Sequence, residues 1–284
     1  MDDRDRISSR ENARIVDARK VRDGKDRTRI FVEGKRLVRE ALRSAIEIED
    51  AFVADDFRDD DLRRQLNVRL KSVSVVSRSV ADSLAETAND QGIFLVAARP
   101  LGGRDRIEQK LLTVDIPIIV LLHEVNNPSN LGAVIRTAEG AGVVGLIVTR
   151  NSASAYSPKS LRASMGSAFR LPIWEGVNFA EAIGWAKELR LIRTAAAASM
   201  GASHYEVDWR VPRLLVFGSE ADGLSDEQLA SVDNSVSIRM GPEVESLNLA
   251  VAAGVLLFEA RRQQGLERLI DLYSNSGLPR GEQH

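Results

Sequence analysis

Polar residues that could contact a ligand are concentrated in three segments of the chain, residues 126–136, 218–225 and 246–248. Each segment follows an apolar run that is predicted to be a buried strand. In open α/β sheets, ligands bind at the carboxyl ends of the strands. The three segments are therefore candidates for one ligand site, although the same residue types are also common in ordinary turns and on solvated helix faces.

The first segment reads Asn-Asn-Pro-Ser-Asn-Leu-Gly-Ala-Val-Ile-Arg over residues 126–136. Pro128 is predicted to end the strand at 117–122, and a helix is predicted to begin at Leu131 with Ser129 or Asn130 as its cap. At about 100° per residue, Arg136 lies roughly 140° from Leu131, so it is expected to project away from the core. The apolar face of this helix is formed by Leu131, Val134, Ile135 and Ala138.

The second segment, Gly-Ser-Glu-Ala-Asp-Gly-Leu-Ser, follows a predicted strand at 214–217. Its glycines allow a sharp turn and a close approach of the backbone to a ligand. Glu220 and Asp222 are thus expected in a loop at the carboxyl edge of a sheet. Ser225 and Gln228 have the spacing of a capping box, which predicts a helix from Asp226.

The third segment places Ser246 and Asn248 near the start of the last predicted helix, residues 244–264, after a strand at 236–240 and a Gly-Pro turn. Small side chains in this helix permit very close packing, which suits either the core or a dimer interface. They are Ala250, Ala252, Ala253 and Gly254. Core packing explains these small residues but does not explain Ser246 and Asn248.

Composition excludes several classes of protein. The chain has no cysteine, which excludes disulfides, thiolate metal sites and cysteine nucleophiles. Its only histidines are His123, His204 and His284, so no metal site is expected. No apolar run is long enough to span a membrane, and the charged start is not a signal peptide. The protein is expected to be soluble and cytoplasmic, with no membrane partner.

Strands and helices alternate along the chain, which indicates an α/β protein. We expect a small α/β/α domain at residues 1–104, a linker at 105–116 and a parallel-sheet domain at 117–284. Gly140-Ala-Gly-Val-Val-Gly145 matches a dinucleotide-binding fingerprint, but that fingerprint requires a strand before it and a helix after it. Here the order is reversed, so these glycines are interpreted as a helix stop and a tight turn.

The net charge of −2 argues against non-specific coating of nucleic acid. However, residues 1–40 carry 13 Arg and Lys against 9 Asp and Glu. Arginine suits bidentate phosphate contacts, although a solvated charged helix would have the same composition. The candidate RNA-binding residues of the first domain are Arg14, Arg19, Lys20, Arg22, Lys35 and Arg36.

Together, the three ordered segments resemble the motifs of the SpoU (TrmH) family of RNA ribose 2′-O-methyltransferases, within the SPOUT superfamily. Residues 162–166 and 171–172 are similar to the middle region of that family. The first domain, through residues 33–38, is similar to the ribosomal-protein-like RNA-binding domain that often precedes the catalytic domain. The resemblance implies a deep trefoil knot in the parallel-sheet domain, a homodimer, and S-adenosylmethionine bound in the knot.

The resemblance also implies roles for individual residues. The catalytic set would be Asn130, Arg136, Glu220, Ser246 and Asn248. The cofactor-binding set, acting mostly through backbone groups, would be Thr194, Gly218, Ile238 and Leu247.

Arg136 is expected to reach the cofactor of the other subunit. A guanidinium pKa above about 12 makes Arg136 a costly base. It is therefore interpreted as an electrostatic clamp on the developing alkoxide, oriented by Asn130. Glu220 is expected to hold Arg136 or the RNA, and Ser246 and Asn248 to orient the hydroxyl. His123 is the alternative base.

The expected substrate is 23S ribosomal RNA rather than transfer RNA, because of the appended first domain. Two competing hypotheses are a base methyltransferase of the related knotted group and a non-catalytic RNA-binding or ribosome-assembly protein. The sequence does not identify the target nucleotide.

Overall fold

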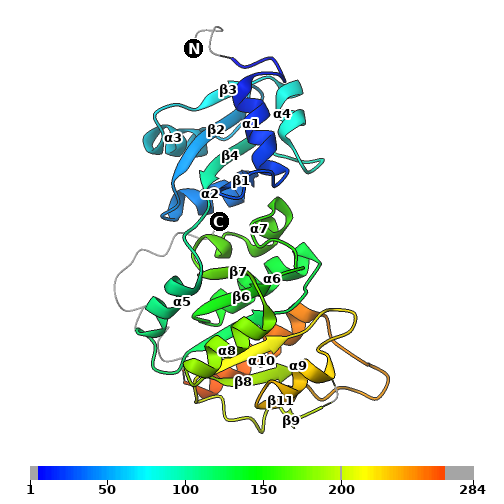
Figure 1. Ribbon diagram of the computed structural model, residues 1–284. Helices are drawn as coiled ribbons and strands as arrows, with labels where there is room; N and C mark the ends of the chain where they lie inside the picture. The colour runs from blue at the N-terminus through cyan, green and yellow to red at the C-terminus, as the bar shows by residue number, and fades with distance from the viewer. Residues whose placement is uncertain (1–5, 199, 266–284) are drawn as a thin grey trace.

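The computed structural model describes residues 6–198 and 200–265. In this part of the chain the N-terminal unit and the C-terminal unit each form a sheet covered by helices (Figure 1). None of the described helices is long and apolar enough to cross a membrane.

The N-terminal unit is a four-stranded mixed sheet in the order β1-β4-β2-β3. Only β2 and β3 pair in parallel. Helix α1 packs beside α4, and α2 packs beside α3. The strands are β1 (Arg29–Glu33), β2 (Ile48–Ala54), β3 (Ser74–Val76) and β4 (Ile93–Ala98), and the helices are α1 (Ala13–Arg22), α2 (Lys35–Arg43), α3 (Asp60–Arg69) and α4 (Arg78–Leu84).

The C-terminal unit is a seven-stranded sheet in the order β7-β6-β5-β10-β8-β11-β9. All of its pairs are parallel, so the carboxyl ends of its strands share one edge. The strands are β5 (Ile118–Leu122), β6 (Gly145–Thr149), β7 (Ile173–Val177), β8 (Ile192–Ala196), β9 (Ala202–Ser203), β10 (Arg213–Phe217) and β11 (Asn234–Ser237). These findings confirm the predicted α/β class with a parallel sheet in the second unit. The trefoil knot stays a prediction.

Helices cover both faces of this sheet. One face packs against α5 (Arg104–Leu111) and α8 (Phe179–Glu188), whose Ile107 and Trp185 are buried. The opposite face packs against α6 (Pro128–Gly140), α7 (Pro158–Ser164) and α10 (Leu249–Gln263). The short helices α9 (Asp226–Ala230) and η2 (Ser167–Phe169) complete the unit.

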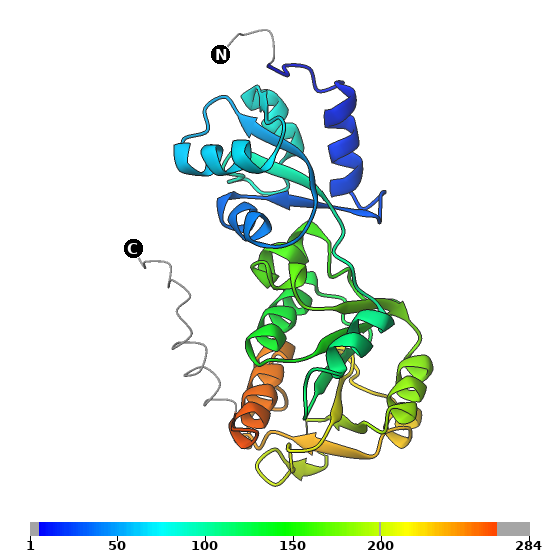
Figure 2. The ribbon, with the colours of Figure 1, turned by 90° about the vertical axis from the view of Figure 1, so that its left-hand side faces the viewer.

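The two units contact each other through α7, η2 and the N-terminal elements β1 and α2 (Figures 1 and 2). Arg170 lies 2.8 Å from the carboxylate of Glu40, and Arg162 lies 2.5 Å from that of Glu86. Gly166 has a φ of +91°, and a Cβ there would lie 2.6 Å from the Cβ of Glu40. The contact between the units therefore includes ion pairs and a close approach of the Gly166 backbone, and buried apolar residues of both units belong to one cluster.

Three local predictions differ from the structure. Helix α6 begins at Pro128 rather than Leu131, because the Asn127 side chain caps it and proline suits the first helical position. The predicted linker contains α5, which buries Ile107 against Gly145. Helix α10 begins only at Leu249, where the Asn248 side chain caps it. The predicted capping box of Ser225 and Gln228 is confirmed.

Candidate active site

The loop after β10 is closed on itself by backbone contacts. The amides and carbonyls of Ser219 and Gly223 exchange hydrogen bonds of 3.0 and 3.1 Å. The amide of Asp222 donates to the Ser219 hydroxyl at 3.0 Å. A Cβ on Gly218 would lie 2.2 Å from the carbonyl carbon of Gly223, so only glycine permits this closure. The loop therefore presents Glu220 outward from a fixed backbone.

Asn130 joins all three polar segments through side-chain hydrogen bonds. Its amide nitrogen donates to Glu220, and its amide oxygen accepts from the amide nitrogen of Asn248 at 3.1 Å. The oxygen of Asn248 in turn accepts from the backbone N–H of Ala250 at 2.9 Å, as the cap of α10. That N–H can only donate, so it fixes the orientation of both asparagine amides. The structure thus brings together three of the five predicted catalytic residues.

A cavity of about 630 Å³ lies beside this network. It is lined by residues that follow β8, by the loop after β10, and by the segment between β11 and α10. Gly218, Ile238 and Leu247 line it, as do Ser246, Asn248 and Glu220. Among the described residues, the only charged side chains in its wall are the carboxylates of Glu220 and Asp222. The cavity therefore suits a small ligand that is partly apolar and carries positive charge.

Thr194 does not line this cavity. Its hydroxyl accepts from the buried guanidinium of Arg213, and its backbone is paired with β10 and β11. The cavity wall is formed instead by Ala196, Ala197 and Ala198, farther along the chain at the carboxyl end of β8. In the sequence, these alanines could have been recognised from the run of small residues at the end of the predicted strand.

Arg136 lies outside the cavity of its own chain. It is an exposed residue of α6, and no described residue forms a hydrogen bond or ion pair with its side chain. The expectation that Asn130 orients Arg136 is not met in this chain, because Asn130 contacts Glu220 and Asn248 instead. Ser246 is exposed at the cavity wall, and within the described residues its hydroxyl has no protein partner.

His123 is buried beside β5 and both of its ring nitrogens are engaged. Nδ1 lies 3.1 Å from the Thr149 hydroxyl, and Nε2 lies 2.7 Å from the Gln228 amide nitrogen. The Gln228 oxygen accepts from the Ser225 amide, which turns its nitrogen toward the ring. Nε2 is therefore the acceptor and Nδ1 carries the proton. Burial lowers the pKa of His123 below its usual value of 6.5, so the neutral ring is favoured. His123 does not line the cavity. It therefore fits a structural role better than that of the alternative base.

The predicted RNA-binding cations of the first domain differ in their surroundings. Arg14 is paired with Asp50, and Arg22 with Asp23. Lys35 donates to the carbonyl of Arg58, and Arg19 donates to that of Arg10. Within the described residues, the side chains of Lys20 and Arg36 are exposed and have no such partner.

Comparison with known proteins identifies the family. A model of the SpoU rRNA methylase family matches residues 117–258. A model described as RNA 2′-O ribose methyltransferase substrate binding matches residues 31–101. The chain belongs to the SpoU rRNA methylase family.

Two relatives are similar to most of the chain. The chain is 33% identical over 212 residues to the 23S rRNA (guanosine-2′-O-)-methyltransferase RlmB of Shewanella oneidensis, covering 74% of this chain and 86% of the relative. It is 29% identical over 259 residues to the 23S rRNA (guanosine(2553)-2′-O)-methyltransferase RlmP of Bacillus subtilis, covering 90% and 98%.

Solved structures of this family agree with the fold. The SpoU methyltransferase AviRb from Streptomyces viridochromogenes, in complex with AdoMet, superposes with a TM-score of 0.77 at 27% identity, covering 89% of this chain and 98% of that one. An AdoMet-bound rRNA methyltransferase from Sinorhizobium meliloti gives a TM-score of 0.74 at 25% identity, covering 90% and 97%. The chain is thus an RNA methyltransferase that uses S-adenosylmethionine.

The cavity fits this cofactor. Its volume is within the range of small-molecule sites, about 300–1,000 Å³. Its apolar wall suits an adenine ring, and its two carboxylates suit a sulfonium cation. None of the described residues that line it is cationic, so none opposes that charge. In the described part of the chain, no cluster of histidine and acidic residues could hold a metal ion.

Proposed function

We propose that this protein methylates a ribose 2′-hydroxyl of 23S ribosomal RNA. The observation that carries the proposal is the hydrogen-bonded chain from Glu220 through Asn130 to Asn248 at the cavity wall. The names of the relatives and the matched substrate-binding region support ribosomal RNA as the substrate. Residues 1–104 would bind this RNA and residues 117–284 would carry the reaction. A ribosomal RNA substrate also supports a cytoplasmic location.

S-adenosylmethionine would supply the electrophilic methyl group. Gly218, Ile238 and Leu247, with the alanines after β8, would hold the cofactor. Ser246 would position the ribose hydroxyl, since its own hydroxyl lies at the cavity wall and bonds to no described residue. The hydrogen bond from Asn130 would keep the Glu220 side chain turned toward the cavity. A preorganised set of this kind needs little rearrangement as the reaction proceeds.

A homodimer would complete the site. Val251 and Phe258, seven residues apart on one face of α10, have relative exposures of 52% and 50%. Gly254 lies on the same face of α10 and next to α6, because a Cβ there would be in ordinary van der Waals contact, 3.7 Å, with the side chain of Thr137, the neighbour of Arg136. A partner docked on α10 would therefore lie beside Arg136. Its guanidinium would then serve the partner's cavity and stabilise the developing alkoxide, since the described residues of the cavity wall include no cation.

The test is methyl transfer from labelled S-adenosylmethionine to ribosomal RNA isolated from cells that lack the gene. Primer extension would then map the methylated nucleotide. A synthetic RNA with a 2′-deoxy sugar at that position and an intact base should accept no label. Label on the deoxy substrate would instead indicate base methylation. Absence of transfer to any ribosomal or transfer RNA would indicate a non-catalytic RNA-binding protein.

A further inference from the structure

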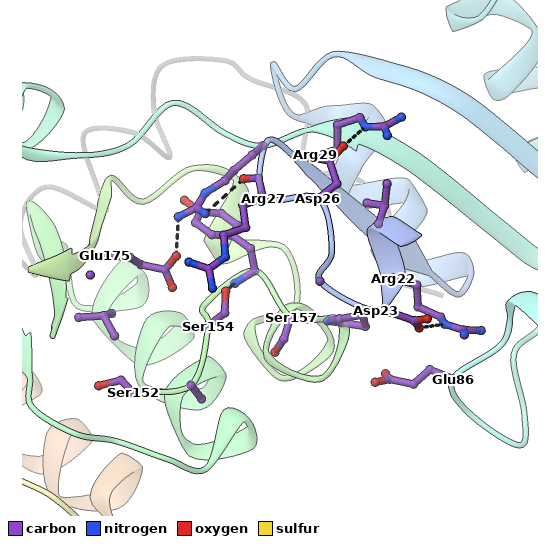
Figure 3. A pocket seen from close by; sticks show the side chains of 18 of the residues that line it. Arg22, Asp23, Asp26, Arg27, Arg29, Glu86, Ser152, Ser154, Ser157 and Glu175 are labelled. Carbon is purple, nitrogen blue, oxygen red and sulfur yellow. Dashed lines mark hydrogen bonds and ion pairs between the residues drawn. The ribbon is translucent and has the colours of Figure 1, made fainter. Parts of the chain in front are cut away.

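A second cavity, of about 920 Å³, lies between the two units (Figure 3). It shares no lining residue with the cofactor cavity. The N-terminal unit contributes the end of α1, residues 22–29, and Arg99. The C-terminal unit contributes the segment after β6, residues 149–158, and the end of β7. We call this space the interdomain cleft. No role assigned so far to the active site uses it.

Five arginines and four carboxylates line the interdomain cleft, and the carboxylates are all held by arginine. Asp23 pairs with Arg22 at 2.9 Å, and Asp26 pairs with Arg29 at 2.8 Å. Glu86 pairs with Arg162 at 2.5 Å, and Glu175 pairs with Arg99. The acidic groups of the cleft are therefore already neutralised.

Two arginines of the cleft keep their charge unpaired. Arg27 and Arg150 are exposed, and no described carboxylate forms an ion pair with either. Arg150 uses only Nε, which donates to the carbonyl of Gly176 at 3.0 Å. The Arg27 side chain extends from the N-terminal unit toward Ser154 on the opposite wall (Figure 3). The two free guanidinium groups thus belong to opposite walls of the cleft.

The interdomain cleft is continuous with the active-site edge of the sheet. The amide of Val125 donates to the Ser152 hydroxyl at 3.2 Å, and the amide of Ala153 donates to the carbonyl of Val125 at 2.9 Å. Val125 lies two residues before Asn127, the cap of the helix that carries Asn130. The wall of the cleft is therefore bonded directly to the loop that begins the active site.

We propose that the interdomain cleft binds the sugar-phosphate backbone of the RNA strand that flanks the target nucleotide, with Arg27 and Arg150 contacting phosphates from opposite sides. Free guanidinium groups are suited to phosphate oxygens, and backbone contacts position an RNA without reading its sequence. The inference rests on the proposed function, because it places the same RNA substrate on the surface next to the active site.

The test measures binding of a fluorescein-labelled, single-stranded RNA of 15 nucleotides to Arg27→Gln, Arg150→Gln and the double variant. The slope of log K against log salt concentration should become shallower by about 0.7 for each lost phosphate contact. At 0.1 M salt this corresponds to roughly a 5-fold loss of affinity. The double variant should lose about 25-fold if the two contacts are independent. Its affinity for S-adenosylmethionine should be unchanged.

Arg190→Gln is the matched control, because Arg190 is an exposed arginine just before β8, at the amino edge of the sheet. The Arg27→Lys, Arg150→Lys double variant keeps both charges and should retain most of the affinity. Unchanged affinity and salt slope in the glutamine double variant would overturn the inference, as would an equal loss in Arg190→Gln. The methyl-transfer assay distinguishes these results from failure of the proposed function. In that case the unmodified protein itself would transfer no label to RNA.

Discussion

Asn130 is the residue on which the active-site arrangement depends. It accepts from one neighbour and donates to the other, and the cap of α10 fixes the direction of both bonds. The sequence placed Asn130 in the catalytic set through resemblance alone. Its contacts could not be predicted, because residues 130, 220 and 248 are joined only by the folded sheet.

Asn130→Asp should slow methyl transfer roughly 100-fold, the scale of losing one preorganised donor. The substitution keeps the size of the side chain but replaces the amide that donates to Glu220 with a second carboxylate. Single-turnover rates with saturating cofactor would measure the effect. Asn126→Asp is the control, since Asn126 is an exposed residue of the same segment. Equal rates in the two variants would contradict the role of Asn130.

His123 should make stability depend on pH. The pKa of the folded His123 lies below 6.5, so the unfolded chain takes up its proton first as the pH falls. The contribution of neutral His123 to the free energy of unfolding is complete above pH 6.5. It is lost as the pH falls from 6.5 to the lower pKa that His123 has in the folded protein.

Urea unfolding at pH 7.5 and pH 5.5 would measure this dependence. The unmodified protein should lose more stability at the lower pH than His123→Gln does. The same loss in both proteins would show that His123 is not responsible.

At the scale of elements, a predicted helix start was correct where the capping residue had been identified and incorrect where it had been missed. The start of α9 was predicted because Ser225 and Gln228 form a complete capping box. The start of α6 was missed because Pro128 was interpreted as a breaker, whereas with Asn127 as the cap it occupies the first helical turn. The corrected start leaves Asn130 free to contact Glu220 and Asn248, because Asn127 does the capping.

Gly132 of the first motif serves packing rather than the ligand. A Cβ at Gly132 would lie 2.4 Å from the carbonyl oxygen of Ser160 in α7, whereas one at Gly140 of the same helix would meet nothing within 4 Å. Gly132→Ala should therefore destabilise the protein by about 1–3 kcal/mol, as overpacking does. Gly140→Ala should have little effect. Urea unfolding of the two variants would measure the difference, and equal midpoints would contradict this packing role.

At the scale of the whole molecule, the sequence indicated two α/β units but not how they meet. The interdomain cleft combines residues 22–29 with residues 149–158, which are far apart in the chain. Local periodicity carries no information on such a contact. The charge of the N-terminal segment led to the prediction of Arg14 and Arg22 as RNA-binding residues, and both are ion-paired in the structure. Arg27 and Arg150, which have no ion pair with any described carboxylate, were not singled out from the sequence.

The proposed dimer should depend on the exposed face of α10. Val251→Glu places a charge on that face and should convert the protein to monomers, as measured by sedimentation equilibrium. Val68→Glu is the matched control, because Val68 of α3 is 88% exposed and lies in the other unit. A dimer that withstands the Val251 substitution would show that another surface joins the subunits.

The most direct test of the proposed site is Arg136→Ala, assayed for both cofactor binding and methyl transfer. In the proposed dimer the Arg136 guanidinium faces the ribose hydroxyl in the partner's site rather than the cofactor, so the affinity for S-adenosylmethionine should change by no more than about 2-fold. Methyl transfer to the ribose hydroxyl should be abolished, because the cation that stabilises the alkoxide is gone. Transfer at the rate of the unmodified protein would contradict the proposed mechanism.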